Sequence, residues 1–176
     1  SDSLSFGTSD FVVSMWVYPL SFGAEMALYE TLTIGGAGSR SNAFVFVQTS
    51  GTGKLRIFSN GGYTATSSNG LNLNNWNHIS LVRNTTSTYY YINSVLDPTS
   101  VSLTTNILNG EALIGRLGDS SAEYFNGFID EVRVWNRSLN AGEIYEMYAS
   151  NLYKFNSTQW YFYVNQSQNV TTGLST

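Results

Sequence analysis

Short runs of alternating or β-branched apolar residues dominate the sequence, and clusters of glycine, serine and asparagine separate them. A period of two residues is typical of strands that bury one face. Breaks such as Gly35-Gly36, Gly51-Thr52-Gly53 and Asn109-Gly110 mark turns. The pattern predicts an all-β, two-sheet antiparallel sandwich with strands at residues 11–20, 26–34, 43–49, 54–59, 76–83, 88–96, 112–116 and 128–135.

One segment near the end of the sequence predicts a helix instead. Asn140 is followed three residues later by Glu143, a spacing that resembles a capping box. Ile144, Met147 and Tyr148 then share one helical face. We expect a short helix that ends near Ser150 and covers one end of the sandwich.

The composition restricts the classes of function. Only 11% of the 176 residues are charged, the formal net charge is -4, and the eight Lys and Arg residues are scattered. This argues against nucleic acid as a partner, and no apolar run is long enough for membrane insertion. The chain has no cysteine, so a thiolate metal site and a redox site are excluded. A surface rich in Ser, Thr, Asn and Tyr is typical of extracellular, cell-surface β-proteins.

The last residues form a segment of different character. From residue 151 the composition becomes polar, except for STQWYFYVN at 157–165, where Trp160, Phe162 and Val164 alternate with Tyr161 and Tyr163. This alternation predicts an extra C-terminal strand. We therefore divide the chain into a domain at 1–150 and a tail at 151–176. The strand could dock on its own domain, enter a neighbouring copy, or begin a further module.

Three stretches together resemble a known family. They are SDFVVSMWVYP (9–19), NNWNHISLVRN (74–84) with the following TYYYINSVL, and IGRLGDSSAEYFNGFIDEVRVWNRSLNAGEIYEMY (114–148). The set resembles the laminin G-like, or concanavalin A-like, jelly-roll domains of microbial cell-surface proteins. The resemblance implies an extracellular module that contacts glycans or proteins and that is not an enzyme. It also implies that the module could bind calcium, as some members of the family do. An adhesion module is the function we expect.

The resemblance fails at the start of the chain. Family members usually carry an apolar strand before the stretch that corresponds to residues 1–6, and this sequence begins after it. A missing strand would leave an acceptor edge near Leu4 and Phe6. Trp160, Phe162 and Val164 of another copy could fill that edge by β-augmentation. The alternative function is therefore a self-assembling subunit of a surface filament.

Enzymatic readings find little support in the sequence. His78 is the only histidine and lies inside a predicted strand, where a structural or surface role is the simpler reading. The Glu-x-Asp-x-x-Glu strand of hydrolytic relatives of this fold is absent. Asp130 and Glu131 should point to opposite faces as strand neighbours, and so cannot act as a carboxylate pair.

Asp130 is the one candidate metal ligand. Strand alternation places it on the core face with Val132 and Val134. A buried carboxylate needs a partner, so Asp130 could bind calcium through oxygen ligands or could fix the neighbouring turn.

Surface modification and glycan contacts are less defined by the sequence. Glycosylation sequons begin at Asn84, Asn136, Asn156, Asn165 and Asn169, a number that chance explains in a chain rich in Asn, Ser and Thr. Aromatic platforms for a glycan are available, but most should lie in the core, so no glycan contact is assigned to one residue. The candidates are Tyr63, Trp76, Tyr89, Tyr90, Tyr91 and Tyr124.

Overall fold

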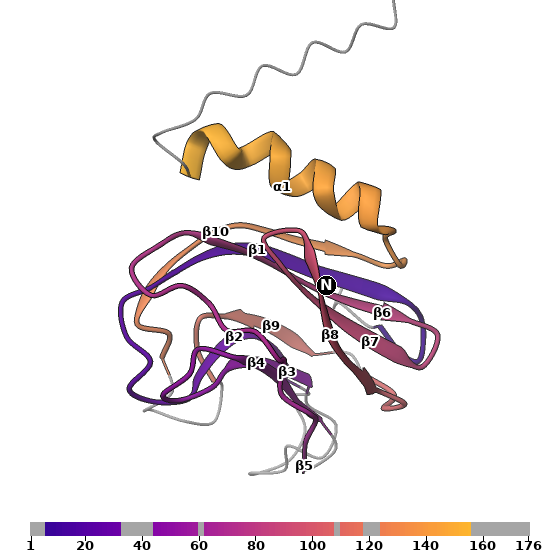
Figure 1. The fold of residues 1–176 in the computed structure, drawn as a ribbon. Helices are drawn as coiled ribbons and strands as arrows, with labels where there is room; N and C mark the ends of the chain where they lie inside the picture. Colours follow the sequence, from indigo (N-terminus) through magenta and orange to yellow (C-terminus); the bar gives the residue numbers. More distant parts are fainter. Residues whose placement is uncertain (1–5, 33–43, 60–61, 108–109, 118–123, 156–176) are drawn as a thin grey trace, which may run out of the picture.

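The computed structural model describes residues 6–32, 44–59, 62–107, 110–117 and 124–155. Two five-stranded antiparallel sheets face each other, and one helix lies outside them (Figure 1). This arrangement confirms the predicted sandwich. The first sheet has the order β10 (Gly127–Trp135), β1 (Phe11–Pro19), β6 (Asn77–Asn84), β7 (Ser87–Ile92) and β8 (Val95–Ser102). The second has the order β5 (Gly62–Tyr63), β4 (Leu55–Ser59), β3 (Phe44–Gln48), β2 (Met26–Leu32) and β9 (Glu111–Ile114).

The main core lies between the two sheets. Alternate residues of β1 point inward from the first sheet, and residues of β2, β3 and β4 meet them from the second. Each large apolar side chain buried there contributes roughly 1.5–3 kcal/mol relative to an exposed one. Fully buried members of this core include Phe11, Val13, Met15, Val17, Leu28, Phe46, Leu55, Ile57, Ile79 and Leu81.

One predicted strand is in fact two. The run at 88–96 is interrupted at Asn93 and Ser94, whose φ angles are 51° and 64°. Ile92 pairs with Val95, so these two residues form the whole loop between β7 and β8. Asparagine tolerates the left-handed region that such a tight hairpin requires. The predicted strand at 88–96 included this Asn-Ser turn, because aromatic and β-branched residues lie on both sides of it.

A β-bulge changes the direction of the acidic residues in β10. Ser14 pairs with Arg133 and Trp16 pairs with Asp130, which leaves Glu131 and Val132 opposite one residue of β1. Glu131 has a φ of 50°, as an extra residue that bends the strand. Because of this extra residue, the residues before the bulge and those after it alternate between the two faces of the sheet in opposite phase.

The predicted orientation of Asp130 is therefore wrong. Ile129 and Val132 both pack against the core, and Asp130 lies on the outer face of the sheet. Glu131 does not point to the opposite face from Asp130, because both carboxylates contact the same ammonium group of Lys154. A prediction that assumes strict alternation of side chains between the two faces cannot account for the extra residue of the bulge.

Helix α1 (Ala141–Phe155) begins as the sequence predicts. The Asn140 side chain accepts hydrogen bonds from the backbone N–H groups of Gly142 (2.9 Å) and Glu143 (3.1 Å), and the Glu143 carboxylate accepts one from the Asn140 N–H (2.9 Å). These bonds form a complete capping box. The helix continues to Phe155 instead of ending near Ser150.

The position of α1 differs from the prediction. The helix lies across the outer face of the first sheet, above β10 and β1, and does not close an end of the sandwich (Figure 1). Ile144 and Met147 pack against Val12 and Val82, which point outward from β1 and β6. This face carries apolar side chains that need cover, which explains the placement.

The start and end of the chain bear on the predicted assembly contact. Phe6 is 4% exposed and stacks on Phe11 with ring centroids 4.3 Å apart. It belongs to the core of its own domain, and the acceptor edge expected near Leu4 and Phe6 stays a prediction. Leu4 and the strand residues Trp160, Phe162 and Val164 lie outside the described residues.

No helix in the described ranges has the length and hydropathy needed to span a membrane.

The capping box gives a direct test of how α1 is held. We expect Asn140→Ala to lower the free energy of unfolding by about 1 kcal/mol, because two backbone N–H groups lose their acceptor. Urea denaturation followed by circular dichroism measures this change. The exposed helix residue Glu146 is the control, since Glu146→Ala should stay within about 0.5 kcal/mol of the parent. Equal stability of both variants would contradict the assignment.

Candidate functional site

A pocket opens where the C-terminal half of α1 meets the first sheet. Its volume is about 190 Å³. One wall comes from α1, the floor from β1, and the rest from the segment before β6 and from the turn between β7 and β8. We call it the aromatic pocket, and it is lined by Trp16, Asn75, Trp76, Asn93, Tyr148, Leu152 and Phe155.

Trp16 forms the floor of the aromatic pocket. Its side chain is 2% exposed and stacks on the rings of Tyr148, at a centroid distance of 5.6 Å, and Phe155, at 4.4 Å. Its indole Nε1–H is buried and has no hydrogen-bond partner among the described residues. A buried donor without a partner is unfavourable. An acceptor brought by a ligand could satisfy it.

Trp76 and Phe155 form the rim of the aromatic pocket. Both are half-buried, and their ring centroids are 4.6 Å apart. Trp76 also contacts Tyr18 of β1 edge to face, at 5.6 Å. These contacts fix the Trp76 ring before a ligand arrives, which reduces the entropy that binding would cost.

Two asparagines supply the polar groups. The Asn93 side-chain oxygen accepts a hydrogen bond from the His78 backbone N–H (2.9 Å), and the Asn75 amide donates to the Leu73 carbonyl (2.9 Å). Within the described residues, the Asn93 amide nitrogen and the Asn75 amide oxygen form no hydrogen bond. Within the part of the chain that the structure describes, the pocket therefore presents the NH₂ group of Asn93 as a donor and the amide oxygen of Asn75 as an acceptor, and each amide is anchored by its other atom.

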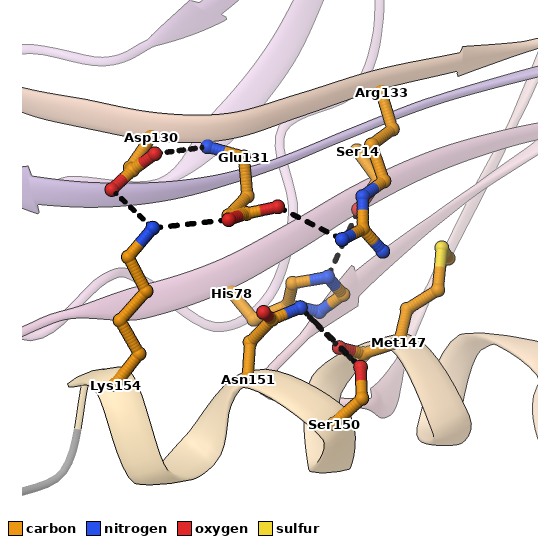
Figure 2. Close-up of polar contacts among 9 residues, drawn as sticks. All are labelled: Ser14, His78, Asp130, Glu131, Arg133, Met147, Ser150, Asn151 and Lys154. Atoms are coloured by element: carbon orange, nitrogen blue, oxygen red, sulfur yellow. Dashed lines mark hydrogen bonds and ion pairs between the residues drawn. The ribbon is translucent and has the colours of Figure 1, made fainter.

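His78 lies beside the pocket, next to Trp16. Figure 2 shows it between the sheet and α1. It is 2% exposed, its Nε2 is 2.9 Å from the Ser14 hydroxyl, and its ring lies 5.3 Å from that of Trp16. Burial, with a smaller contribution from the nearby Arg133 charge, lowers its pKa to about 4. The imidazole is thus neutral at pH 7. The described residues place no carboxylate in contact with it, in agreement with a structural role.

Charged side chains join the end of α1 to the bulge in β10 (Figure 2). The Lys154 ammonium lies 2.9 Å from Asp130 and 3.0 Å from Glu131, and Glu131 accepts a hydrogen bond from Arg133 at 2.8 Å. The bond from Lys154 holds the pKa of both carboxyl groups below its usual range. These contacts are partly exposed, so they orient the helix end more than they stabilise the fold.

The Asp130 geometry bears on the predicted calcium site. Asp130 also accepts a hydrogen bond from the Glu131 backbone N–H at 2.7 Å, which fits the alternative role of fixing the local turn. No group of three or more His, Cys, Asp or Glu side chains suited to a metal occurs in the described ranges. Calcium binding at Asp130 stays a prediction.

Of the aromatic candidates from the sequence, Trp76 lines the pocket. Tyr90 is fully buried in the core and Tyr91 is 8% exposed beneath α1, whereas Tyr63 and Tyr124 are exposed away from the pocket. The other six residues that line the pocket, among them Asn75, Asn93 and Phe155, were not predicted as site residues. The Asn-Ser turn signal could have identified Asn93, but nothing in the sequence brings the end of a helix to Trp76.

The sequon residues fall into two groups. Asn84 and Asn136 are exposed. Asn156, Asn165 and Asn169 lie outside the described residues, and glycosylation at all five positions stays a prediction.

The comparison with known proteins agrees with the family resemblance of the sequence motifs. A model of the Concanavalin A-like lectin/glucanases superfamily matches residues 1–145. No curated protein matches the chain.

Solved structures share the fold at low sequence identity. The CBM40 module of the Ruminococcus gnavus IT-sialidase, bound to α2,3-sialyllactose, has a TM-score of 0.67 and 14% identity, over 81% of this chain and 84% of that one. Domain 4 of AbnA, a GH43 extracellular arabinanase from Geobacillus stearothermophilus, in complex with arabinotriose, has a TM-score of 0.64 and 18% identity, over 82% and 68%. A Bacteroides ovatus protein has a TM-score of 0.62 and 18% identity, over 80% of this chain. The chain spans only 41% of that protein.

His78 makes the stability of the domain depend on pH. Its pKa is about 4 when folded and about 6.5 when unfolded, so the unfolded chain binds more protons between these values and stability falls as the pH drops. From pH 6.5 to pH 5 we expect the free energy of unfolding to fall by about 1.5 kcal/mol.

Urea denaturation at the two pH values measures this loss. His78→Gln should remove most of it, because the chain has no other histidine. The same pH dependence in the parent and the variant would show that His78 is not the cause.

Proposed function

This chain belongs to the Concanavalin A-like lectin/glucanases superfamily, and from that premise we propose that it is a non-catalytic, extracellular module that binds glycans. The observation that carries the proposal is the aromatic pocket, in which two tryptophans lie beside two anchored asparagine amides. Adhesion to a glycan-coated surface is the role that we propose for such a module.

The lining of the pocket suits a sugar ring. Aromatic rings bury the apolar C–H face of a sugar, and the amides pair with its hydroxyl groups, which act as both donors and acceptors. The Asn93 amide nitrogen and the Asn75 amide oxygen provide one of each. A volume of about 190 Å³ suits a small group, such as one terminal sugar unit, better than a folded partner.

Structures of the same fold support this class of ligand. The CBM40 module was solved with a sialylated oligosaccharide, and domain 4 of AbnA with arabinotriose. Both names refer to parts of carbohydrate-active enzymes, an IT-sialidase and a GH43 arabinanase. By analogy, we propose carbohydrate as the ligand class and leave the position of the site to the geometry of this chain.

The absence of catalysis is part of the proposal. General acid–base chemistry needs a titratable group within hydrogen-bond reach of the reacting atoms. The residues that line the aromatic pocket include no Asp, Glu, Lys, Arg or His, and their one titratable side chain is the Tyr148 phenol. His78 lies beneath them and is shielded from solvent.

Replacement of Trp76 tests the proposed function. We expect Trp76→Ala to weaken binding to the best ligand on a glycan array by about tenfold or more, because a central aromatic contact is lost. Isothermal titration calorimetry measures the change. Tyr145→Ala is the matched control, since Tyr145 is an exposed aromatic residue of α1 that does not line the pocket. A folded Trp76→Ala variant with parent affinity would overturn the assignment.

We also propose a second function, in which copies of this chain assemble into a surface filament. One observation on the edge of the first sheet favours it. Among the described residues, β10 pairs with β1 alone, so its outer edge is open. A groove of about 330 Å³ follows it, between Arg133, Trp135 and Arg137 on one side and α1 on the other. An unpaired edge is a template for an added strand. Residues 157–165 of a neighbouring copy are the strand that we propose for this edge.

Light scattering distinguishes the two functions. If the tail of one copy completes the sheet of the next in an open filament, the intact chain forms large linear assemblies, because a head-to-tail contact whose rotation does not close continues from copy to copy. A version that ends at Asn156 should then have the mass of a monomer. If both chains are stable monomers, the assembly proposal fails and the glycan proposal is unaffected.

A further inference from the structure

Four aromatic rings form a continuous row that starts in the aromatic pocket. Phe155 contacts Trp76 at 4.6 Å between centroids, Trp76 contacts Tyr18 at 5.6 Å, and Tyr18 contacts Phe128 at 5.8 Å. The row crosses from the end of α1 over β1 to the edge strand β10. We call these four residues the aromatic row.

The outer end of the aromatic row is open to solvent. Phe128 is 58% exposed, and it lies directly opposite Tyr18 in the pairing of β1 with β10. Single exposed apolar residues are common. This one differs because it extends an unbroken line of rings that ends in a pocket with free hydrogen-bonding groups. The aromatic row therefore connects the aromatic pocket at one end with an exposed ring, Phe128, at the other.

The pocket and the row carry no net charge. All seven residues that line the pocket are uncharged, and so are Tyr18 and Phe128. The Lys154 ammonium lies 5.1 Å from the centroid of the Phe155 ring, and this cation and Arg133 pair with two anions, Asp130 and Glu131. A carboxylate brought into this site would lose water without gaining a free cation.

We propose that the aromatic pocket and the aromatic row form one extended site for an uncharged, linear oligosaccharide. This inference rests on the proposed function and specifies its ligand class. A terminal sugar unit occupies the pocket, where Asn75 and Asn93 pair with its hydroxyl groups. The following units stack along Trp76, Tyr18 and Phe128. The site thus differs in ligand charge from a module that binds sialylated glycans.

An array of neutral and acidic glycans of increasing length, probed with the full chain, tests the inference. We expect neutral oligosaccharides to bind, with affinity that rises from the disaccharide to the tetrasaccharide as more of the row is covered. Preference for acidic glycans, or affinity independent of length, would overturn the extended neutral site and leave the proposed function intact. If no glycan binds, both fail.

Phe128→Ala separates the row from the pocket. We expect this variant to bind the best neutral tetrasaccharide about fivefold more weakly than the parent, and the matching disaccharide equally well, because only the longer ligand reaches β10. Tyr145→Ala should change neither affinity. Equal losses for both lengths, or no loss for the longer one, would contradict stacking on Phe128. Circular dichroism checks that the variant is folded.

Discussion

The burial of Trp16 on the outer face of a sheet is the constraint on which the rest of this structure depends. A tryptophan that points away from the core of a sandwich needs a second apolar layer, and α1 supplies it through Tyr148 and Phe155. The same layer excludes water from His78. The helix is thus an integral part of the domain, and its Tyr148, Leu152 and Phe155 side chains line the aromatic pocket above Trp16.

The bulge in β10 determines how the end of the helix is held. One extra residue at Glu131 turns two consecutive carboxylates toward α1, where Lys154 meets both. Without it, one of them would face the core and need a buried partner. The charged contacts neutralise one another beside the aromatic row, and the proposed neutral ligand rests on that balance. The bulge therefore bears on the helix position and on the proposed ligand charge.

Local patterns in the sequence predicted the elements better than their relations. Alternation located most strands, and the spacing of Asn140 and Glu143 located the start of α1, because these signals depend on neighbouring residues alone. The orientation of Asp130 could not follow from alternation, since one bulge residue reverses it. The aromatic pocket could not be predicted from the sequence either, because Trp16, Asn93 and Phe155 are distant in sequence and meet only through the packing of α1. Trp76 was among the candidates, but nothing in the sequence distinguished it from aromatic residues of the core.

The most direct test of the account is an NMR titration of the tryptophan indole N–H signals, of which the chain has four. Addition of a neutral oligosaccharide should shift the signals of Trp16 and Trp76, because these two side chains line the aromatic pocket. Trp135, which borders the other groove, should stay unchanged. Glycan binding that shifts Trp135 and leaves Trp16 and Trp76 unperturbed would contradict the account, because it would place recognition elsewhere on the domain.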